Sequence, residues 1–103
     1  YRVILDGEAD VTVGFTTDGD LTNDELVLLE DDQQFWPPYY VAPVIREELL
    51  EQDQGIADVL NEVSAKLNDE VVQQLNAAVD IDKQEYEEVA KQFLTDKGII
   101  SEN

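Results

Sequence analysis

The chain lacks cysteine and histidine altogether, and these two absences remove several kinds of chemistry. Without cysteine there can be no disulfide, no thiolate metal site and no thiol nucleophile. Without histidine the chain loses the commonest general base, the commonest ligand of transition metals and the usual pH switch. No glycine-rich phosphate loop is present, and the two serines, Ser64 and Ser101, have no base pattern around them. These absences argue against an enzyme.

Basic residues are also scarce, with 6 lysines and arginines against 25 acids and a net charge of −19. Such a surface repels phosphate backbones and anionic membranes, so we expect no nucleic-acid partner. It favours cationic ligands and basic protein surfaces, although solubility or adaptation to salt explains most of the charge. Carboxylates are so frequent that their spacing alone identifies no catalytic pair. The acids of residues 18–25 do not fit the calcium-loop template, so no metal site is predicted.

Length and hydrophobic content bound the fold. The 103 residues suffice for one core, and 43% of them are hydrophobic, which is enough for a globular fold. No apolar run approaches the 18 residues of a membrane-spanning helix. The chain begins with Tyr1-Arg2-Val3 rather than with methionine, so we expect it to be a piece of a longer polypeptide.

The chain is organised around residues 35–46, Phe-Trp-Pro-Pro-Tyr-Tyr-Val-Ala-Pro-Val-Ile-Arg, which we call the aromatic-proline segment. It holds all three prolines and half of the aromatic residues of the chain. Pro37 and Pro38 remove two backbone donors and favour extended geometry before them. Such a stiff segment can form part of a binding wall. The alternative is a rigid loop whose rings plug a core.

The remaining pattern predicts strands first and helices after them. Residues 1–5 are typical of a last helical turn ended by Asp6-Gly7. Strands are predicted at 11–15, 26–29 and 40–44, and Gly14 within the first allows a close approach of backbone or ligand. Helices are predicted at 46–52, at 56–67, after an N-cap at Asn68, and after an N-cap at Asp82 with its end at Lys97-Gly98.

This order predicts an α+β piece, short strands followed by about four helices packed on one side of a small sheet. The last helix should turn Tyr86 and Phe93 into the core, since both lie on its apolar stripe. A sheet of two or three strands carries exposed edges, and these would allow two copies of the chain to dimerise.

Two aromatic residues are the candidate ligand contacts. Phe15 ends the first predicted strand, and Tyr39 follows the proline pair, so both lie where strands leave the predicted sheet. Ligands commonly bind at this edge of an open sheet. A quaternary ammonium group has no hydrogen-bond donor, and aromatic faces hold it through cation–π attraction. Two rings do not enclose a cation, so the rest of such a cage would lie elsewhere.

Several motifs carry a specific resemblance over nearly the whole chain. They are Asp10–Gly19, Leu26–Asp32, Phe35–Tyr39, Ala42–Arg46, Leu67–Glu70 and Phe93–Gly98. In order and spacing the chain resembles the C-terminal third of the extracytoplasmic substrate-binding proteins of ABC transporters for glycine betaine, carnitine, choline and proline betaine. The resemblance implies a non-enzymatic protein that binds a quaternary ammonium osmoprotectant without a cofactor. It implies the transporter's permease subunit as protein partner and a location on the extracytoplasmic face of the membrane.

In that family two α/β lobes of the periplasmic-binding-protein type II fold close on the ligand, and an aromatic cage surrounds its trimethylammonium group. The resemblance implies that residues 1–15 end lobe 2 and lead to the crossover, and that residues 16–103 form the C-terminal part of lobe 1. It places Phe15 and Tyr39 in the cage, with phenylalanine at a position where the family pattern has tyrosine. The alternative is an acidic, non-catalytic interaction module whose helices dock on a basic protein and whose aromatic residues form its core. A hydrolase that uses carboxylates is a weaker alternative.

Overall fold

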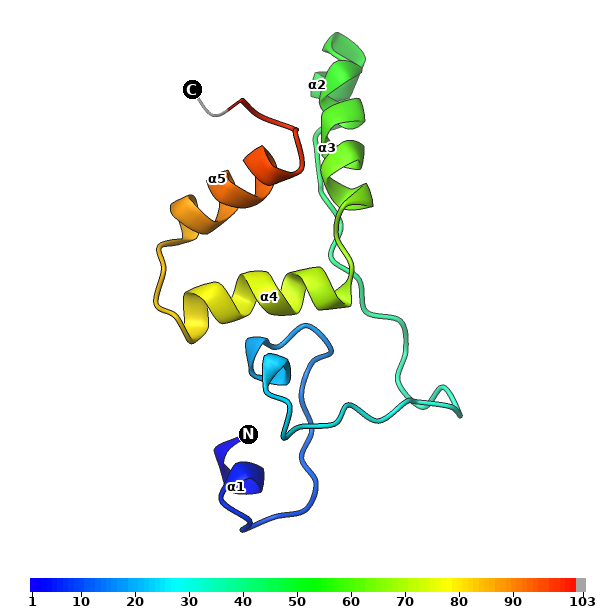
Figure 1. Cartoon of the computed structure of the whole chain (residues 1–103). Coiled ribbons are helices and arrows are strands. Elements are labelled where there is room, and N and C mark those ends of the chain that lie inside the picture. Colours follow the sequence, from blue (N-terminus) through cyan, green and yellow to red (C-terminus); the bar gives the residue numbers. More distant parts are fainter. Residues whose placement is uncertain (102–103) are drawn as a thin grey trace. The chain divides into compact units, whose positions relative to one another are not determined.

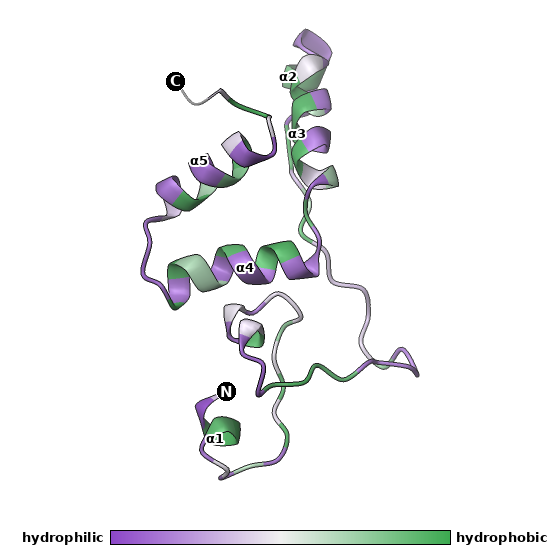
Figure 2. Cartoon of the chain, in the orientation of Figure 1, coloured by the Kyte–Doolittle hydropathy of each residue, from purple (hydrophilic) through white to green (hydrophobic). Residues whose placement is uncertain are grey.

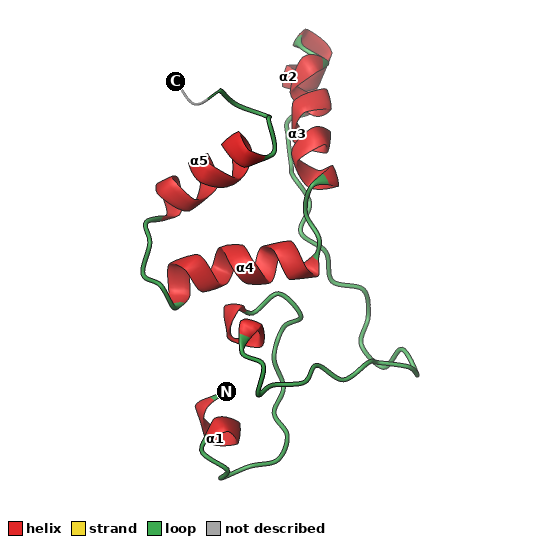
Figure 3. Ribbon diagram, in the orientation of Figure 1, coloured by secondary structure: helices red, strands yellow, loops and turns green. Residues whose placement is uncertain are grey.

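The computed structural model describes residues 1–101, and in these residues it contains helices and loops but no β-strand (Figures 1 and 3). In chain order the elements are α1 (Arg2–Leu5), the 3₁₀ helix η1 (Gly19–Thr22), α2 (Glu47–Gln52), α3 (Gly55–Ala65), α4 (Asp69–Asp80) and α5 (Tyr86–Asp96). They divide into two compact units. The first unit is Tyr1–Leu28 together with Leu67–Asn103, and the second is Leu29–Lys66.

The predicted α+β class is therefore wrong for the described residues. The three segments expected as strands, 11–15, 26–29 and 40–44, are all loop (Figure 3). β-branched residues favour extended backbone, but a strand also needs a neighbouring strand to complete its hydrogen bonds. No ladder forms between these segments, and Val13, Val27 and Val41 are largely or fully exposed. Because residues 1–101 have no strand edge, the expected dimerisation through such edges is not supported either.

The helix predictions rest on local signals, and most of them are confirmed. Asn68 caps α4 as expected: its side-chain oxygen accepts a hydrogen bond of 2.9 Å from the Val71 amide. Gly7 and Gly98 follow the ends of α1 and α5 in the left-handed conformation, at φ +74° and +73°. The predicted cap at Asp82 is wrong, because α5 begins only at Tyr86, after an N-cap at Glu85.

Helix α4 is the centre of the first unit, since it packs against both η1 and α5. Hydrophobic and hydrophilic residues both occur along its length (Figure 2). Its apolar side chains, Val71, Val72, Leu75, Ala78 and Val79, are all half-buried. Val71, Leu75 and Ala78 line the side of α4 that faces α5, whereas other residues of α4 contact the loop before η1.

The core of the described residues is small. Val89 of α5, which is 9% exposed, is the one buried hydrophobic side chain among residues 1–101. Phe93 is half-buried beside it, in agreement with the predicted stripe. Tyr86 is 75% exposed, so its assignment to the core is wrong. As the first residue of α5, it lies at the end of the helix rather than along its packed length.

The second unit consists of α2, α3 and the loop before them. Along α3 the half-buried Ile56, Leu60 and Val63 follow helical spacing, whereas Val59, which the spacing also places on this side, is 52% exposed. Asp53 ends α2 in an extended conformation, and its carboxylate accepts a hydrogen bond of 2.9 Å from the Gly55 amide at the start of α3. In residues 1–101 no helix combines the length and the apolar character needed to cross a membrane.

Candidate ligand-binding site

Phe15, the first predicted ligand contact, lies in the first unit in the loop that leads to η1. Two hydrogen bonds join its backbone to Asp18. The Phe15 amide donates to Oδ2 of Asp18 over 3.0 Å, and the Asp18 amide donates to the Phe15 carbonyl over 3.1 Å. The residue as a whole is 64% exposed. The backbone of Phe15 is thus fixed on both sides while much of the ring faces solvent.

The carboxylate of Asp18 has a second donor, the phenol of Tyr1. The Tyr1 hydroxyl donates to Oδ2 over 2.5 Å, so one oxygen atom accepts from both Tyr1 and Phe15. Burial, this hydrogen bond and the negative charges of Asp18 and Asp20 raise the pKa of Tyr1 to about 12. The phenol therefore stays protonated, and able to donate, at a pH where an ordinary tyrosine has already ionised. Gly14 makes room for it, because a methyl group at that position would overlap the phenol oxygen.

Helix α4 holds the next residues of the same loop. Nε2 of Gln73 donates to the carbonyl of Thr16 over 2.5 Å, and Nδ2 of Asn76 donates to the carbonyl of Thr17 over 2.7 Å. Gly19 is buried directly against the α4 backbone. Residues 16–20 have the polar sequence Thr-Thr-Asp-Gly-Asp of a solvated turn, but they are not freely solvated. The turn is docked on α4.

Sequence reasoning missed the roles of Tyr1, Asp18, Gln73 and Asn76. The Thr-Thr-Asp-Gly run after Phe15 does signal a turn, because an aspartate side chain readily caps nearby backbone amides. No local signal connects that turn with Gln73 and Asn76, which lie 57 and 59 residues further along the chain than their partners.

Tyr39, the second predicted contact, lies in the second unit within the aromatic-proline segment. The segment begins with a turn in which both carboxylate oxygens of Asp31 are used. They accept hydrogen bonds of 2.9 Å from the amides of Phe35 and Trp36. The rings of Phe35 and Trp36 pack edge to face, with centroids 4.9 Å apart. The beginning of the segment is therefore fixed by its own hydrogen bonds and ring contact.

The rings of the aromatic-proline segment are exposed, and Tyr39 is 86% exposed. The interpretation of these rings as a plug for a core is therefore wrong. Phe15 and Tyr39 belong to different units, so their convergence on one ligand stays a prediction.

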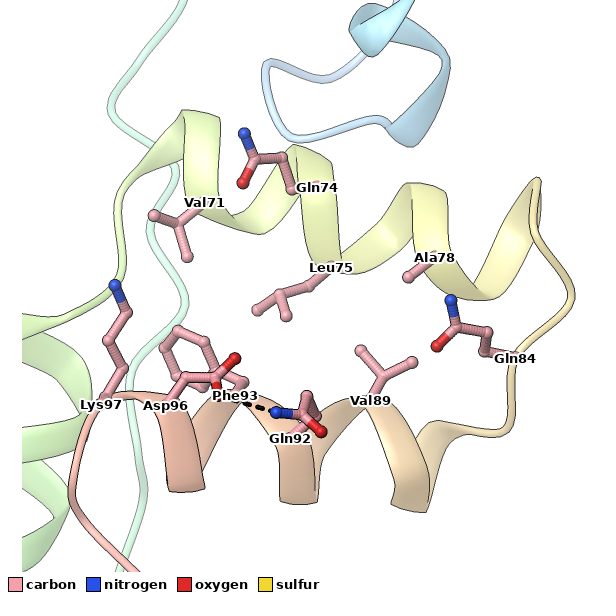
Figure 4. Close-up of a pocket in the computed structure, with 10 residues that line it drawn as sticks. All are labelled: Val71, Gln74, Leu75, Ala78, Gln84, Val89, Gln92, Phe93, Asp96 and Lys97. Carbon is pink, nitrogen blue, oxygen red and sulfur yellow. Dashed lines mark hydrogen bonds between the residues drawn. The ribbon is translucent and has the colours of Figure 1, made fainter.

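The first unit also has a hollow of about 300 Å³ between α4 and α5 (Figure 4). Leu75 points from α4 toward Val89 and Phe93 of α5, so the floor of the hollow is apolar. At its rim Gln92 donates a hydrogen bond of 2.7 Å to Asp96, and the Lys97 ammonium lies 5.9 Å from the centre of the Phe93 ring. Both rim contacts lie within α5 and its C-cap, and the apolar side chains between the two helices are those of a packing seam. In residues 1–101 no group of three or more acidic side chains is placed to hold a metal ion.

Comparison with known proteins identifies the family. Residues 1–96 match the model of the substrate-binding domain of ABC-type glycine betaine transport systems. The chain belongs to this family. The match confirms the resemblance that the sequence motifs indicated for a piece of a binding protein for quaternary amines.

Curated relatives of this substrate-binding domain agree with the family model. The glycine-betaine-binding protein of Pseudomonas aeruginosa is 32% identical over 102 residues, which cover 99% of this chain and 33% of that protein. The carnitine transport binding protein OpuCC of Listeria monocytogenes is 32% identical over 91% of this chain and 30% of its own length. The ergothioneine transport permease/ergothioneine binding protein EgtU of Helicobacter pylori is 36% identical over 82% of this chain and 15% of its own length. The chain thus spans about a third of the length of the first two relatives.

Proposed function

We propose that the chain is the C-terminal part of the substrate-binding protein of an ABC importer for quaternary ammonium osmoprotectants such as glycine betaine, choline or carnitine. The family match over residues 1–96 carries this proposal. The protein would deliver its ligand to the permease subunit on the extracytoplasmic side of the membrane, without chemical change to the ligand. Residues 1–15 would end the second lobe of the whole protein, and residues 16–103 would belong to the first.

Phe15 and Tyr39 are our candidates for the aromatic cage. A cation–π contact contributes about 0.5–2 kcal/mol when water is excluded, so several rings must enclose the trimethylammonium group. Both rings are exposed, as contacts for a ligand must be when no ligand is bound. The acidic interaction module considered above would instead bury both, and this difference supports the binding proposal.

Phenylalanine at position 15 keeps the aromatic face but has no hydroxyl group. If the hydroxyl of the family's tyrosine contributes to binding, Phe15→Tyr should tighten the binding of a quaternary amine. Phe15→Ala should weaken it, since the face itself is then lost.

The isolated chain should bind these amines weakly or not at all, because two rings leave one side of the cation in water, which screens the attraction. The direct test is calorimetric titration of the chain with glycine betaine, choline and carnitine. Micromolar binding by the isolated chain would contradict an incomplete site.

A hybrid protein tests the function itself. This chain replaces the matching third of the Pseudomonas aeruginosa relative, and the hybrid is titrated with the same amines. We expect binding that falls at least about tenfold in Tyr39→Ala and in Phe15→Ala. Tyr40→Ala, in an exposed ring of the same segment, is the matched control. A folded hybrid that binds none of the amines would refute the proposal.

A further inference from the structure

Every residue from Phe15 to Gly19 is held in place by an interaction that the structure shows. Phe15 and Asp18 are joined by two hydrogen bonds, Thr16 and Thr17 are bonded to side chains of α4, and Gly19 packs on the α4 backbone. The hydroxyl of Thr22 also donates to the Gly19 carbonyl over 2.8 Å. The exposed residue Phe15 therefore has a restrained backbone.

The positions of the amide and carbonyl groups set the direction of the Cα–Cβ bond and limit the side chain to a few χ1 rotamers, so a fixed backbone restricts where the ring can lie. At Phe15 both groups are bonded to Asp18, the amide to the carboxylate and the carbonyl to the Asp18 amide. Of these two hydrogen bonds, the one to the Asp18 carboxylate involves a side chain, and the other joins two backbone groups. Loss of the carboxylate would remove the hydrogen bond that the Phe15 amide donates to it and would loosen the backbone that carries the ring.

We propose that Asp18 is the positioning residue of the ligand site: its carboxylate fixes the backbone of Phe15 and so aims the ring at the cation. This role rests on the function proposed above. Asp18 acts through Phe15 and needs no contact of its own with the ligand.

Tyr1 completes the arrangement from the other side. Its phenol donates to the same oxygen of Asp18 that accepts from Phe15, and this holds the carboxylate in the orientation that Phe15 requires. Gly14 leaves the space through which the phenol reaches Asp18. Tyr1 is thus a second positioning residue, one step further from the ring.

The arrangement can be tested in the 103-residue chain without any ligand. The difference between the ultraviolet pH titrations of the wild type and Tyr1→Phe isolates the ionisation of Tyr1, which we expect near pH 12. When Asp18→Ala is introduced into both of these proteins, the ionisation of Tyr1 should move to lower pH. Hydrogen exchange of the Phe15 amide in Asp18→Ala should become at least about tenfold faster than in the wild type. Asp24→Asn is the control, since it removes one charge from an exposed residue of the same region. Unchanged ionisation and exchange in Asp18→Ala would overturn the proposal.

The link to the ligand is tested in the hybrid with the Pseudomonas aeruginosa relative. We expect Asp18→Ala to weaken glycine betaine binding about tenfold. Asp18→Asn, which keeps an acceptor oxygen of lower strength, should lie between Asp18→Ala and the wild type. Asp24→Asn should bind as the wild type does.

A double-mutant cycle separates positioning from direct contact or general loss of structure. In a Phe15→Ala background, Asp18→Ala should weaken binding no further. An equal loss in both backgrounds would show that Asp18 does not act through Phe15 and would overturn the inference. A hybrid that binds the amine normally with alanine at position 18 refutes the inference alone, whereas a folded wild-type hybrid without binding refutes the proposed function as well.

Discussion

Replacing Gly19 with alanine tests whether the loop after Phe15 is docked on α4. A Cβ atom at position 19 would lie 2.6 Å from the amide nitrogen and 2.8 Å from the Cα of Ala77, and 2.9 Å from the carbonyl carbon of Asn76. All three are backbone atoms in the middle of a helix, so none can rotate away. The loop would have to move off α4 to accommodate one methyl group.

The expected cost follows from three contributions. Excess volume at a packed contact costs about 1–3 kcal/mol. Moving the loop also weakens the hydrogen bonds from Gln73 and Asn76, each worth about 1 kcal/mol. Gly19 does not have a positive φ, so alanine can adopt its backbone conformation. Alanine then restricts the unfolded chain, and this offsets about 0.4–1 kcal/mol of the loss in stability. The steric contribution decides the sign, and we expect Gly19→Ala to lower the free energy of unfolding by about 2–3 kcal/mol.

Urea denaturation followed through the backbone amides of α4 measures this change in the first unit, where the midpoint should fall by about 1–2 M. Gly55→Ala is the control, because the added methyl meets only the movable carboxylate of Asp53, and we expect little change in stability. A midpoint for Gly19→Ala within about 0.3 M of the wild type, with the side-chain amide resonances of Gln73 and Asn76 unshifted, would refute the close contact.

Three further outcomes are expected. Phe93→Ala should lower the free energy of unfolding by about 2–3 kcal/mol, less than the loss for a fully buried ring. Tyr39→Ala should lower it by about 1 kcal/mol or less, and equal losses for the two variants in urea melts would contradict this prediction. Thermal melts near pH 7 should show a midpoint that rises with NaCl over tens to hundreds of millimolar, because salt screens the repulsion within a chain of charge −19; a flat response would mean that the acids are paired. The raised pKa of Tyr1 means that its contribution to stability is fully present below about pH 10 and is lost as the pH rises toward 12. Wild type should therefore lose stability in this range more steeply than Tyr1→Phe, and parallel curves would argue against the bond to Asp18.

Helix ends could be predicted because their signals are local. The side chain of Asn68 binds the amide of Val71, which is only three residues away, and Gly7 and Gly98 each lie just after the end of a helix. Asp82 was a misleading signal, since Lys83 takes the left-handed conformation, at φ 60°, and α5 starts three residues later. Strands could not be predicted in the same way, because β-branched composition shows where backbone is extended but not whether a partner strand exists.

The site was predictable only in part, for the same reason. The places of Phe15 and Tyr39 in the sequence and a family resemblance predict both as ligand contacts; the family is confirmed, and the aromatic cage stays a prediction. A group does come close to Gly14, but it is the phenol of Tyr1 and not the backbone or ligand that we expected. Nothing near Gly14 in the sequence indicates that partner, which comes from the preceding helical turn.

The first unit is interrupted in the sequence, and this affects the order in which it can fold. Its hydrogen bonds from Gln73 to Thr16 and from Asn76 to Thr17 close loops of 57 and 59 residues, and the whole second unit lies inside those loops. During synthesis η1 leaves the ribosome long before α4 and has to wait unfolded for the helix that holds it. The free-energy cost of closing such a loop, which is entropic, rises only slowly with length, by about 0.6 kcal/mol for each doubling. The second unit could therefore lengthen or shorten considerably during evolution while the loop that carries Phe15 still docked on the same helix.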